Sequence, residues 1–424
     1  MTRVLLISTY ELGHQPLGVA APAAALRDRG HDVRVLDLAI QDWDPELVDW
    51  AERVAISVPM HTATRLAFEI APRIDRPLAC FGLYAGMCAP IAETLVDRDP
   101  VSAVVRWVEA DPSITVSAPV PARDLLAPPS EYAHLMRAGL RYPIAYVEAS
   151  QGCAHRCRHC PVPVVYDGRI RITPVDTVLA DIDAQVAQGA QHVTFGDPDF
   201  FNGVHHARRV VEAVHARYPN ITFDATVKVE HILRHADMWP WIAERGCLFV
   251  ISAFESVNDD ILTILDKGHT AADGARAIEL LRAAGIEPRP TWLPFTPWTA
   301  REDIRAILEF VAEHHLVGNV DPVQYSIRLL VPEGSLLLGR IDGLGAWDAT
   351  RLSYPWTSDL DEIQSEFAAI VEARTDDPAG DVFNALRALV DLPPVDVSRV
   401  IDAPRLSESW FCCAEPTAAQ LRAV

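Results

Sequence analysis

The chain has 424 residues, of which 50% are hydrophobic, 8% aromatic and 22% charged, a composition typical of a globular protein that excludes a disordered or fibrous one. Its 37 Lys and Arg residues against 58 Asp and Glu residues give a net charge of −21, which argues against nucleic acid and anionic membrane as general partners. The opening MTRVLLIS leads directly into a strand pattern, so no signal peptide is expected, and no run of about 18 apolar residues predicts a membrane span. The eight cysteines are clustered rather than spread as a disulfide framework, which favours a reducing, cytoplasmic location.

The first 110 residues alternate short apolar strands with segments of helix length. A helix is expected at Leu17–Asp28, closed by Gly30. Strands separated by helices predict a parallel sheet covered on both faces, so we expect a doubly wound α/β domain over residues 1–110. The expected strands are Val4–Ser8, Val33–Leu36, Val54–Val58, Leu78–Phe81 and, as a further candidate, Val101–Val105.

Residues 111–144 have a different character, because prolines at 112, 119, 121, 128, 129 and 143 interrupt regular structure. We expect a linker there. About six βα units over residues 145–335 then predict a partial (β/α)6 barrel, open on one side. Residues 336–424 have a mostly helical pattern, with a break around Asp376–Asp381.

The expected barrel strands are Ala145–Glu148, His192–Phe195, Thr222–Thr226, Leu248–Ala253, Glu287–Leu293 and Val323–Leu330. The expected helices between them are Pro174–Gln188, His205–Arg217, Ile232–Glu244, Ala271–Ala284 and Arg301–His314.

Three cysteines directly after the first barrel strand carry the strongest signal. Cys153, Cys157 and Cys160 form the pattern C-x3-C-x2-C. Three thiolates on one short loop can ligate three irons of a [4Fe–4S] cubane and leave the fourth iron open for a cofactor. A zinc site is the alternative, and it would need a fourth ligand such as His155 or His159.

This pattern, in this place, resembles the radical S-adenosylmethionine (SAM) superfamily. The resemblance implies a [4Fe–4S] cluster on the three cysteines and a SAM molecule on the open iron. Electron transfer to SAM then gives a carbon radical, so a small-molecule substrate and a reducing partner such as flavodoxin or ferredoxin are also implied. The family usually has an aromatic residue before the third cysteine, near the adenine, where this chain has His159.

Residues at the ends of later strands extend the resemblance over roughly residues 145–330. Gly196, Asp197 and Asp199 follow the second barrel strand, where the family contacts the methionine amino group of SAM. A plain strand-to-helix turn with a capping Asp explains the same residues. The resemblance also implies a nucleoside-contacting region, to which we assign Lys228, Glu230 and Glu255.

A doubly wound domain before the radical domain resembles the cobalamin-binding subclass. Its glycine-containing loops, around Gly13 and Gly18 and around Gly82 and Gly86, follow strands whose carboxyl ends bind ligands in such sheets. The D-x-H-x-x-G cobalt-ligating motif is missing. The sequence therefore leaves open whether the domain binds cobalamin or only shapes the substrate cavity.

Adjacent cysteines near the C-terminus form a second set of thiols. Cys412 and Cys413 belong to a Cys-Cys-Ala-Glu-Pro tail that resembles a radical SAM family with this ending, in which the first cysteine is sometimes selenocysteine. Adjacent cysteines rarely form a disulfide with each other, and paired thiolates favour thiophilic centres. We therefore assign both a catalytic role: they hold trivalent arsenic, which a SAM-derived radical alkylates, as in the arsenic-alkylating radical enzymes that the tail resembles.

Other interpretations stay open at this point. The tail thiols could be a redox pair or a radical relay, serving cobalamin-assisted methylation or another carbon-centred reaction, or plain core residues. Cys80, Cys88 and Cys247 lie in apolar runs and are expected in the core. A non-enzymatic iron–sulfur sensor is a hypothesis of another class, although a sensor usually has four protein ligands.

Overall fold

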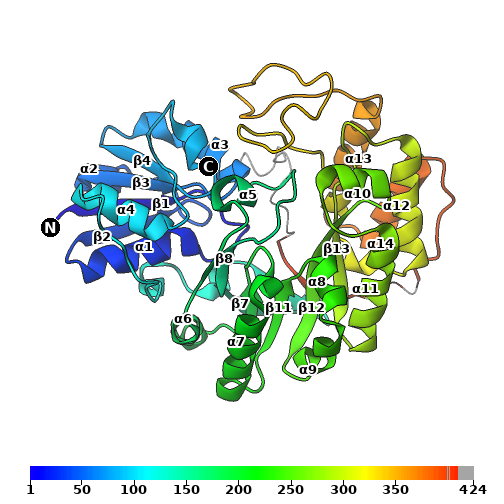
Figure 1. Ribbon diagram of the computed structural model, residues 1–424, viewed down its shortest axis with the longest axis horizontal. Coiled ribbons are helices and arrows are strands. Elements are labelled where there is room, and N and C mark those ends of the chain that lie inside the picture. Colours follow the sequence, from blue (N-terminus) through cyan, green and yellow to red (C-terminus); the bar gives the residue numbers. More distant parts are fainter. Residues whose placement is uncertain (399, 401, 409–424) are drawn as a thin grey trace.

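The structure is a computed structural model, and it describes residues 1–398, 400 and 402–408. It contains two main sheets, one in the N-terminal part of the chain and one in the barrel (Figure 1). Within the described residues, no helix combines the length and apolar character that crossing a bilayer requires.

The N-terminal sheet is doubly wound, as predicted. Its five strands are parallel and have the order β2-β1-β3-β4-β5. Helices α1 and α4 pack on one face of the sheet, and α2 and α3 pack on the other. The bounds are β1 Arg3–Ser8, α1 Leu17–Asp28, β2 Asp32–Asp37, α2 Pro45–Trp50, β3 Arg53–Ser57, α3 His61–Ile70, β4 Leu78–Phe81, β5 Glu93–Leu95 and α4 Pro100–Glu109.

The candidate strand Val101–Val105 is wrong, because these residues belong to helix α4. Pro100 stands in the first turn of that helix, where its missing N–H costs nothing, and the Asp99 side chain accepts a hydrogen bond from the Ser102 N–H at 3.2 Å. The buried valines of α4 recur at helical spacing. The fifth strand is instead β5, at the sheet edge.

The segment predicted as a linker contains regular structure at its end. Two short 3-10 helices, η3 (Arg123–Leu125) and η4 (Pro129–Glu131), precede the antiparallel hairpin of β6 (His134–Arg137) and β7 (Leu140–Val147). Ala138 and Gly139, with φ values of 50° and 73°, make the tight turn between these strands. The hairpin can form because all but one of the prolines precede it.

Strands β7, β10, β11, β12 and β13 run parallel and form the partial barrel. They belong to a seven-stranded sheet with the order β13-β12-β11-β10-β7-β6-β14. The strand bounds are β10 His192–Phe195, β11 Thr222–Thr226, β12 Cys247–Glu255 and β13 Glu287–Trp292, and the small hairpin of β8 (Ser150–Gly152) and β9 (Ile170–Ile172) follows β7. The helix bounds are α5 Val162–Tyr166, α6 Val175–Ala187, α7 Val204–Arg217, α8 Val229–Arg234, α9 Trp239–Ala243, α10 Asp259–Leu265, α11 Ala271–Ala283 and α12 Arg301–Glu313.

Two barrel predictions need correction. The predicted strand Val323–Leu330 begins as the 3-10 helix η8 (Pro322–Ser326), and afterwards only one parallel bridge joins Arg328 to Phe295. The Ser326 hydroxyl donates to the Val323 carbonyl at 2.9 Å, which holds the turn. The predicted helix Ile232–Glu244 is divided into α8 and α9, since Pro240 can start a helix but not continue one.

The described C-terminal residues pack on the open side of the barrel. Helices α13 (Asp361–Ala373) and α14 (Ala379–Leu389) contact η8, and the break between them lies near the predicted position. The chain then returns to the sheet as β14 (Arg405–Leu406), which pairs with β6. Leu406 packs with Phe249 and Ile251 of β12, so the end of the described chain lies inside the barrel opening.

Candidate functional site

The three cysteines of the motif lie in the loop between β8 and α5 and line a single cavity. This cavity has a volume of about 110 Å³ and lies at the carboxyl ends of the barrel strands. Gly152, with φ +78°, leads into the loop, and a Cβ there would lie 2.4 Å from both the Arg169 carbonyl oxygen and the Tyr166 ring. Only glycine allows this entry, so the local sequence fixes the course of the cysteine loop.

The surroundings in the cavity change the pKa values of the Cys153 and Cys157 thiols. Burial raises the pKa of Cys153 to about 12, and burial also raises the pKa of Cys157, although the positive charges of Lys267 and Lys228 oppose the change. A thiol of this kind loses its proton when a metal ion compensates the thiolate charge. The three cysteines of the loop, beside two ammonium groups, can hold an anionic metal cluster.

Glu255 is the centre of a buried group of ion pairs that lines the cysteine cavity. It ends β12 with φ +65°, and its Oε1 lies 3.0 Å from His159 Nε2 and 3.2 Å from Lys267 Nζ. Burial alone would raise its pKa, but Lys267 and His159 lower the pKa to about 2, so Glu255 is a carboxylate. The Nδ1 atom of His159 is buried and has no hydrogen-bond partner among the described residues. His159 and Glu255 thus lie together beside the cysteine loop.

Gly196 and Asp197 contact the residues that precede the cysteine loop, and they do not line the cysteine cavity. Asp197 accepts hydrogen bonds from the Ala149 N–H (2.9 Å) and the Ser150 hydroxyl (2.6 Å). A Cβ on Gly196 would lie 2.1 Å from the Tyr146 ring. Burial raises the pKa of Asp197 to about 7, although these hydrogen bonds oppose the change. Both residues therefore position the β7–β8 turn.

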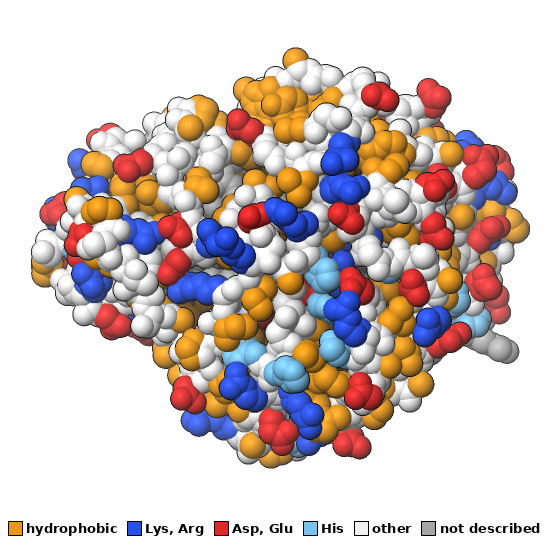
Figure 2. Space-filling view, viewed as in Figure 1, with side chains coloured by type: hydrophobic (Ala, Val, Ile, Leu, Met, Phe, Trp, Pro, Cys, Tyr) orange, Lys and Arg blue, Asp and Glu red, His pale blue; other side chains and the backbone are white. Residues whose placement is uncertain are grey.

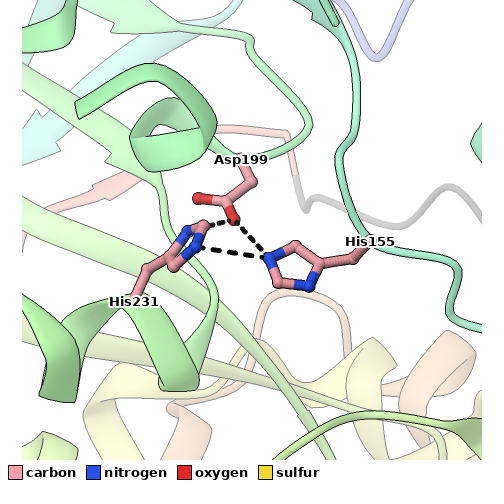
Figure 3. Close-up of side chains that lie close together, drawn as sticks. All are labelled: His155, Asp199 and His231. Atoms are coloured by element: carbon pink, nitrogen blue, oxygen red, sulfur yellow. Dashed lines mark hydrogen bonds and ion pairs between the residues drawn. The ribbon is translucent and has the colours of Figure 1, made fainter. Parts of the chain in front are cut away.

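Asp199 instead lines the cavity and lies beside two histidines, as Figure 3 shows. His231 Nδ1 lies 2.7 Å from Asp199 Oδ2, and His155 Nε2 lies 3.4 Å from His231 Nε2 and 3.8 Å from Asp199 Oδ2. Figure 2 shows several histidine side chains gathered over the region of α7 and α8. One ligand atom from each of the three residues falls within 4.8 Å of the others, so they could hold a metal ion.

Lys228 makes that small cluster a poor cation site. Its Nζ lies 3.0 Å from His155 Nδ1 and 3.5 Å from Glu230 Oε2. Burial, together with the Lys228 charge, lowers the pKa of His155 to about 4, so the ring is neutral and presents Nε2–H toward His231. His155 thus contacts Lys228 and His231, and His159 contacts Glu255 through Nε2. Glu230 pairs with Lys228 and Arg234 outside the cavity wall.

The fold and the cysteine cavity agree with comparisons to known proteins. Residues 147–311 match the family described as the radical SAM superfamily. These residues form a radical S-adenosylmethionine domain. A domain of this kind uses a [4Fe–4S] cluster and SAM, and the chain is an enzyme.

Relatives of the radical SAM domain agree with this assignment. Hopanoid C-3 methylase of Methylococcus capsulatus is 22% identical over 356 residues, which cover 74% of this chain and 68% of that protein. The ribosomal protein uS12 methylthiotransferase RimO of Porphyromonas gingivalis is 26% identical over 183 residues, which cover 40% of this chain and 41% of that protein. The match to RimO thus spans less than half of either chain.

Solved structures extend the likeness to the N-terminal domain. OxsB, a cobalamin-dependent SAM radical enzyme solved with aqua-cobalamin and SAM bound, has a TM-score of 0.64 at 14% identity, covering 88% of this chain and 67% of its own. TsrM from Kitasatospora setae, a radical SAM methyltransferase solved with cobalamin and a [4Fe–4S] cluster, has a TM-score of 0.56 at 16% identity, covering 74% of this chain and 70% of its own. These likenesses establish a shared two-domain fold.

Both lysines of the chain lie in the radical SAM domain and line the cysteine cavity. The sequence contains only Lys228 and Lys267, whereas every other basic side chain apart from histidine is an arginine. Lys228 is 9% exposed and Lys267 is 3% exposed. Each ammonium is a compact point charge, in contrast to the planar guanidinium of the arginines. Sequence reasoning assigned no role to Lys267, although its rarity is a signal that could have found it.

A second cavity, of about 210 Å³, lies between the N-terminal sheet and the radical SAM domain. OxsB and TsrM, which share the fold, were solved with cobalamin bound. No histidine of this chain stands in a D-x-H-x-x-G cobalt-ligating motif. The Glu11 side chain also fills the space beside Gly18, where a Cβ would lie 2.3 Å from its carboxylate. The cavity therefore fits cobalamin poorly.

Cys412 and Cys413 lie outside the described residues. The described chain ends at Glu408, which lies against Gly13 of the N-terminal domain. Glu408 also lines a small cavity with Thr291 and Gln324, two residues that line the cysteine cavity as well. The end of the described chain is thus adjacent to the walls of both cavities.

Proposed function

We propose that the chain is a radical SAM transferase that moves a carbon group from SAM to a small acceptor. Cys153, Cys157 and Cys160 would hold the cluster, and SAM would lie beside Lys228 and Lys267. The observation that carries this proposal is that all three thiols and both lysines line the same cavity at the carboxyl ends of the barrel strands.

In this proposal the residues that line the cysteine cavity have different roles. When bound, the cluster would supply the electron that cleaves a carbon–sulfur bond of SAM. The two ammonium groups offset the negative charge of the thiolates and can receive the SAM carboxylate. Glu255 holds Lys267 and His159 in place through the contacts described above. Buried apolar residues at the ends of β11 and β13, Val227 and Leu293, exclude water from the reacting atoms.

We infer that the acceptor is trivalent arsenic held by Cys412 and Cys413. Paired thiolates are soft ligands and suit a thiophilic centre. Cys412 is four residues beyond Glu408, so the chain can carry it at most about 14 Å from that residue. Glu408 shares its surroundings with residues of the cysteine cavity, which supports a tail that reaches the radical.

The test is SAM consumption by the reconstituted, reduced enzyme with and without arsenite. We expect arsenite-dependent consumption that Cys412→Ser and Cys413→Ser abolish while the iron content stays unchanged. Cys247→Ala is the matched control, since Cys247 is a buried cysteine of β12 outside the cavity. Consumption that is indifferent to arsenite would contradict the arsenic proposal but not the radical SAM chemistry.

Methyl transfer to a carbon or other acceptor is the second candidate. The shared fold with TsrM and the alignment with hopanoid C-3 methylase favour it. The missing cobalt-ligating motif and the Glu11 side chain beside Gly18 count against a cobalamin-assisted route. The products separate the candidates: S-adenosylhomocysteine accompanies methylation, methylthioadenosine accompanies aminocarboxypropyl transfer, and 5′-deoxyadenosine accompanies hydrogen abstraction.

A further inference from the structure

The interdomain cavity contains two buried carboxyl groups that lack a cationic partner. Glu11 follows β1 and Glu148 follows β7, and both line the cavity. Glu11 accepts hydrogen bonds from the Gly18 N–H (3.2 Å) and the Ser57 hydroxyl (3.3 Å). Glu148 accepts hydrogen bonds from the Gln151 side chain (2.9 Å) and the Tyr146 hydroxyl (3.5 Å). Neither forms an ion pair with any residue in the part of the chain that the structure describes.

The cations near these carboxyls are already paired. Arg123 forms an ion pair with Asp181, and Arg171 forms one with Asp99 at 3.0 Å. Burial raises the pKa of Glu11 to about 7 and that of Glu148 to about 8, and the charge of Glu11 further raises the pKa of Glu148. A carboxylate buried without a cation is costly, so a bound cation would be stabilised here.

His14 gives an independent sign that the cavity receives a ligand. Its side chain lines the cavity, is 4% exposed, and has no hydrogen-bond partner for Nδ1 among the described residues. The ring stacks on Tyr146 at 4.5 Å with an interplanar angle of 19°. A buried polar atom without a partner is rare in proteins, and a ligand with a polar group would satisfy it.

We propose that this cavity binds a small organic cation, a primary amine with a short carbon chain, whose ammonium group lies between Glu11 and Glu148. The remaining lining suits the carbon chain, since Leu12, Met60, Phe81 and Val162 supply apolar surface. Pro198 lines this cavity and the cysteine cavity alike, so the amine would lie next to the radical chemistry. The role of the amine as a co-substrate rests on the proposed function, whereas its binding does not.

Calorimetric titration of the full-length protein tests the binding without reductant. The probes are n-butylamine hydrochloride, 1-butanol and sodium butyrate at one ionic strength and pH. We expect n-butylammonium to bind roughly ten-fold or more tightly than the alcohol, because a hydrogen bond to a charged group is stronger than a neutral one. Butyrate is expected not to bind.

Isosteric variants identify the carboxyl groups that bind the amine. Glu148→Gln and Glu11→Gln should each reduce amine affinity roughly ten-fold and leave butanol affinity unchanged, which also shows that the variants are folded. Glu69→Gln, at an exposed position on α3, is the control and should behave as the wild type. Equal affinities for amine and alcohol, unchanged amine affinity in both variants, or hydroxocobalamin binding that the amine does not oppose would each overturn the proposal. Amine binding without any SAM cleavage would instead count against the proposed function.

Discussion

Arg123 and Asp181 form a buried bidentate ion pair, with 2.8 Å between Nε and Oδ1 and 3.0 Å between Nη2 and Oδ2. The same guanidinium donates hydrogen bonds to the carbonyl oxygens of Gln15 (3.0 Å) and Tyr146 (2.7 Å). One side chain thus joins the loop after β1, the segment before the barrel, helix α6 and strand β7. Asp181 and Tyr146, which this guanidinium contacts, also line the interdomain cavity.

Removing that guanidinium should therefore destabilise the protein strongly. Arg123→Ala leaves Asp181 as an uncompensated buried charge, which costs about 3–5 kcal/mol. The measurement is the free energy of unfolding in urea. Arg27→Ala is the control, since Arg27 and Asp124 form an exposed pair at 2.8 Å and its loss costs about 1 kcal/mol or less. Equal losses in the two variants would contradict the structural role of Arg123.

Each motif cysteine should be required for iron binding. Cys157→Ala removes one of three thiolates, and the reconstituted protein is expected to lose most of its iron and sulfide. Chemical iron analysis and visible absorption measure the loss. Cys247→Ala should retain the full iron content, because that buried thiol lies in β12 away from the loop. Normal iron content in the Cys157 variant would refute the assignment of the cluster ligands.

Lys267 and Glu255 should be coupled in their effects on the free energy of unfolding. Lys267→Met leaves the Glu255 carboxylate buried with only His159 beside it, and about 3–5 kcal/mol of unfolding free energy should be lost. The double variant Lys267→Met/Glu255→Gln should recover most of that loss, because the uncompensated charge is gone. Additive losses in the double variant would show that the two residues are not coupled.

The pKa of Glu148 predicts a pH dependence of stability. Because burial raises this pKa from 4.5 to about 8, the folded state keeps a proton that the unfolded state releases. The contribution of Glu148 to stability is therefore full below pH 4.5 and is lost as the pH rises to about 8. Glu148→Gln removes this loss, so the variant should gain at least about 1.4 kcal/mol relative to the wild type between pH 5 and pH 9. A constant difference across that range would contradict the assignment.

The sequence predicts the fold well where periodicity and spacing carry the information. Helix α1 and strands β4, β10 and β11 lie where the sequence predicts them, because apolar runs between helix-length segments are characteristic of parallel strands. Val101–Val105 and Val323–Leu330 fail for one shared reason. A short run that contains several apolar residues fits a strand and a helical turn equally, and the outcome depends on the preceding proline and on tertiary packing.

The site is less predictable than the fold, because partners distant in the sequence define it. The cysteine motif is local and needs no structure to be found. The contacts of His159 with Glu255, and of Asp199 with His231, link different elements of the fold and are not evident from the linear sequence. Glu11 and Glu148 are separated by the whole N-terminal domain, so only the folded chain shows that both line one cavity.

Reductive cleavage of SAM by the anaerobically reconstituted enzyme tests the central claim most directly. We predict that reductant and SAM together give at least one cleavage product, and that Cys153→Ala, Cys157→Ala and Cys160→Ala give none. Cys247→Ala should retain the activity of the wild type. Absence of every product from protein with a full cluster, or product formation by any of the three motif variants, would contradict the account.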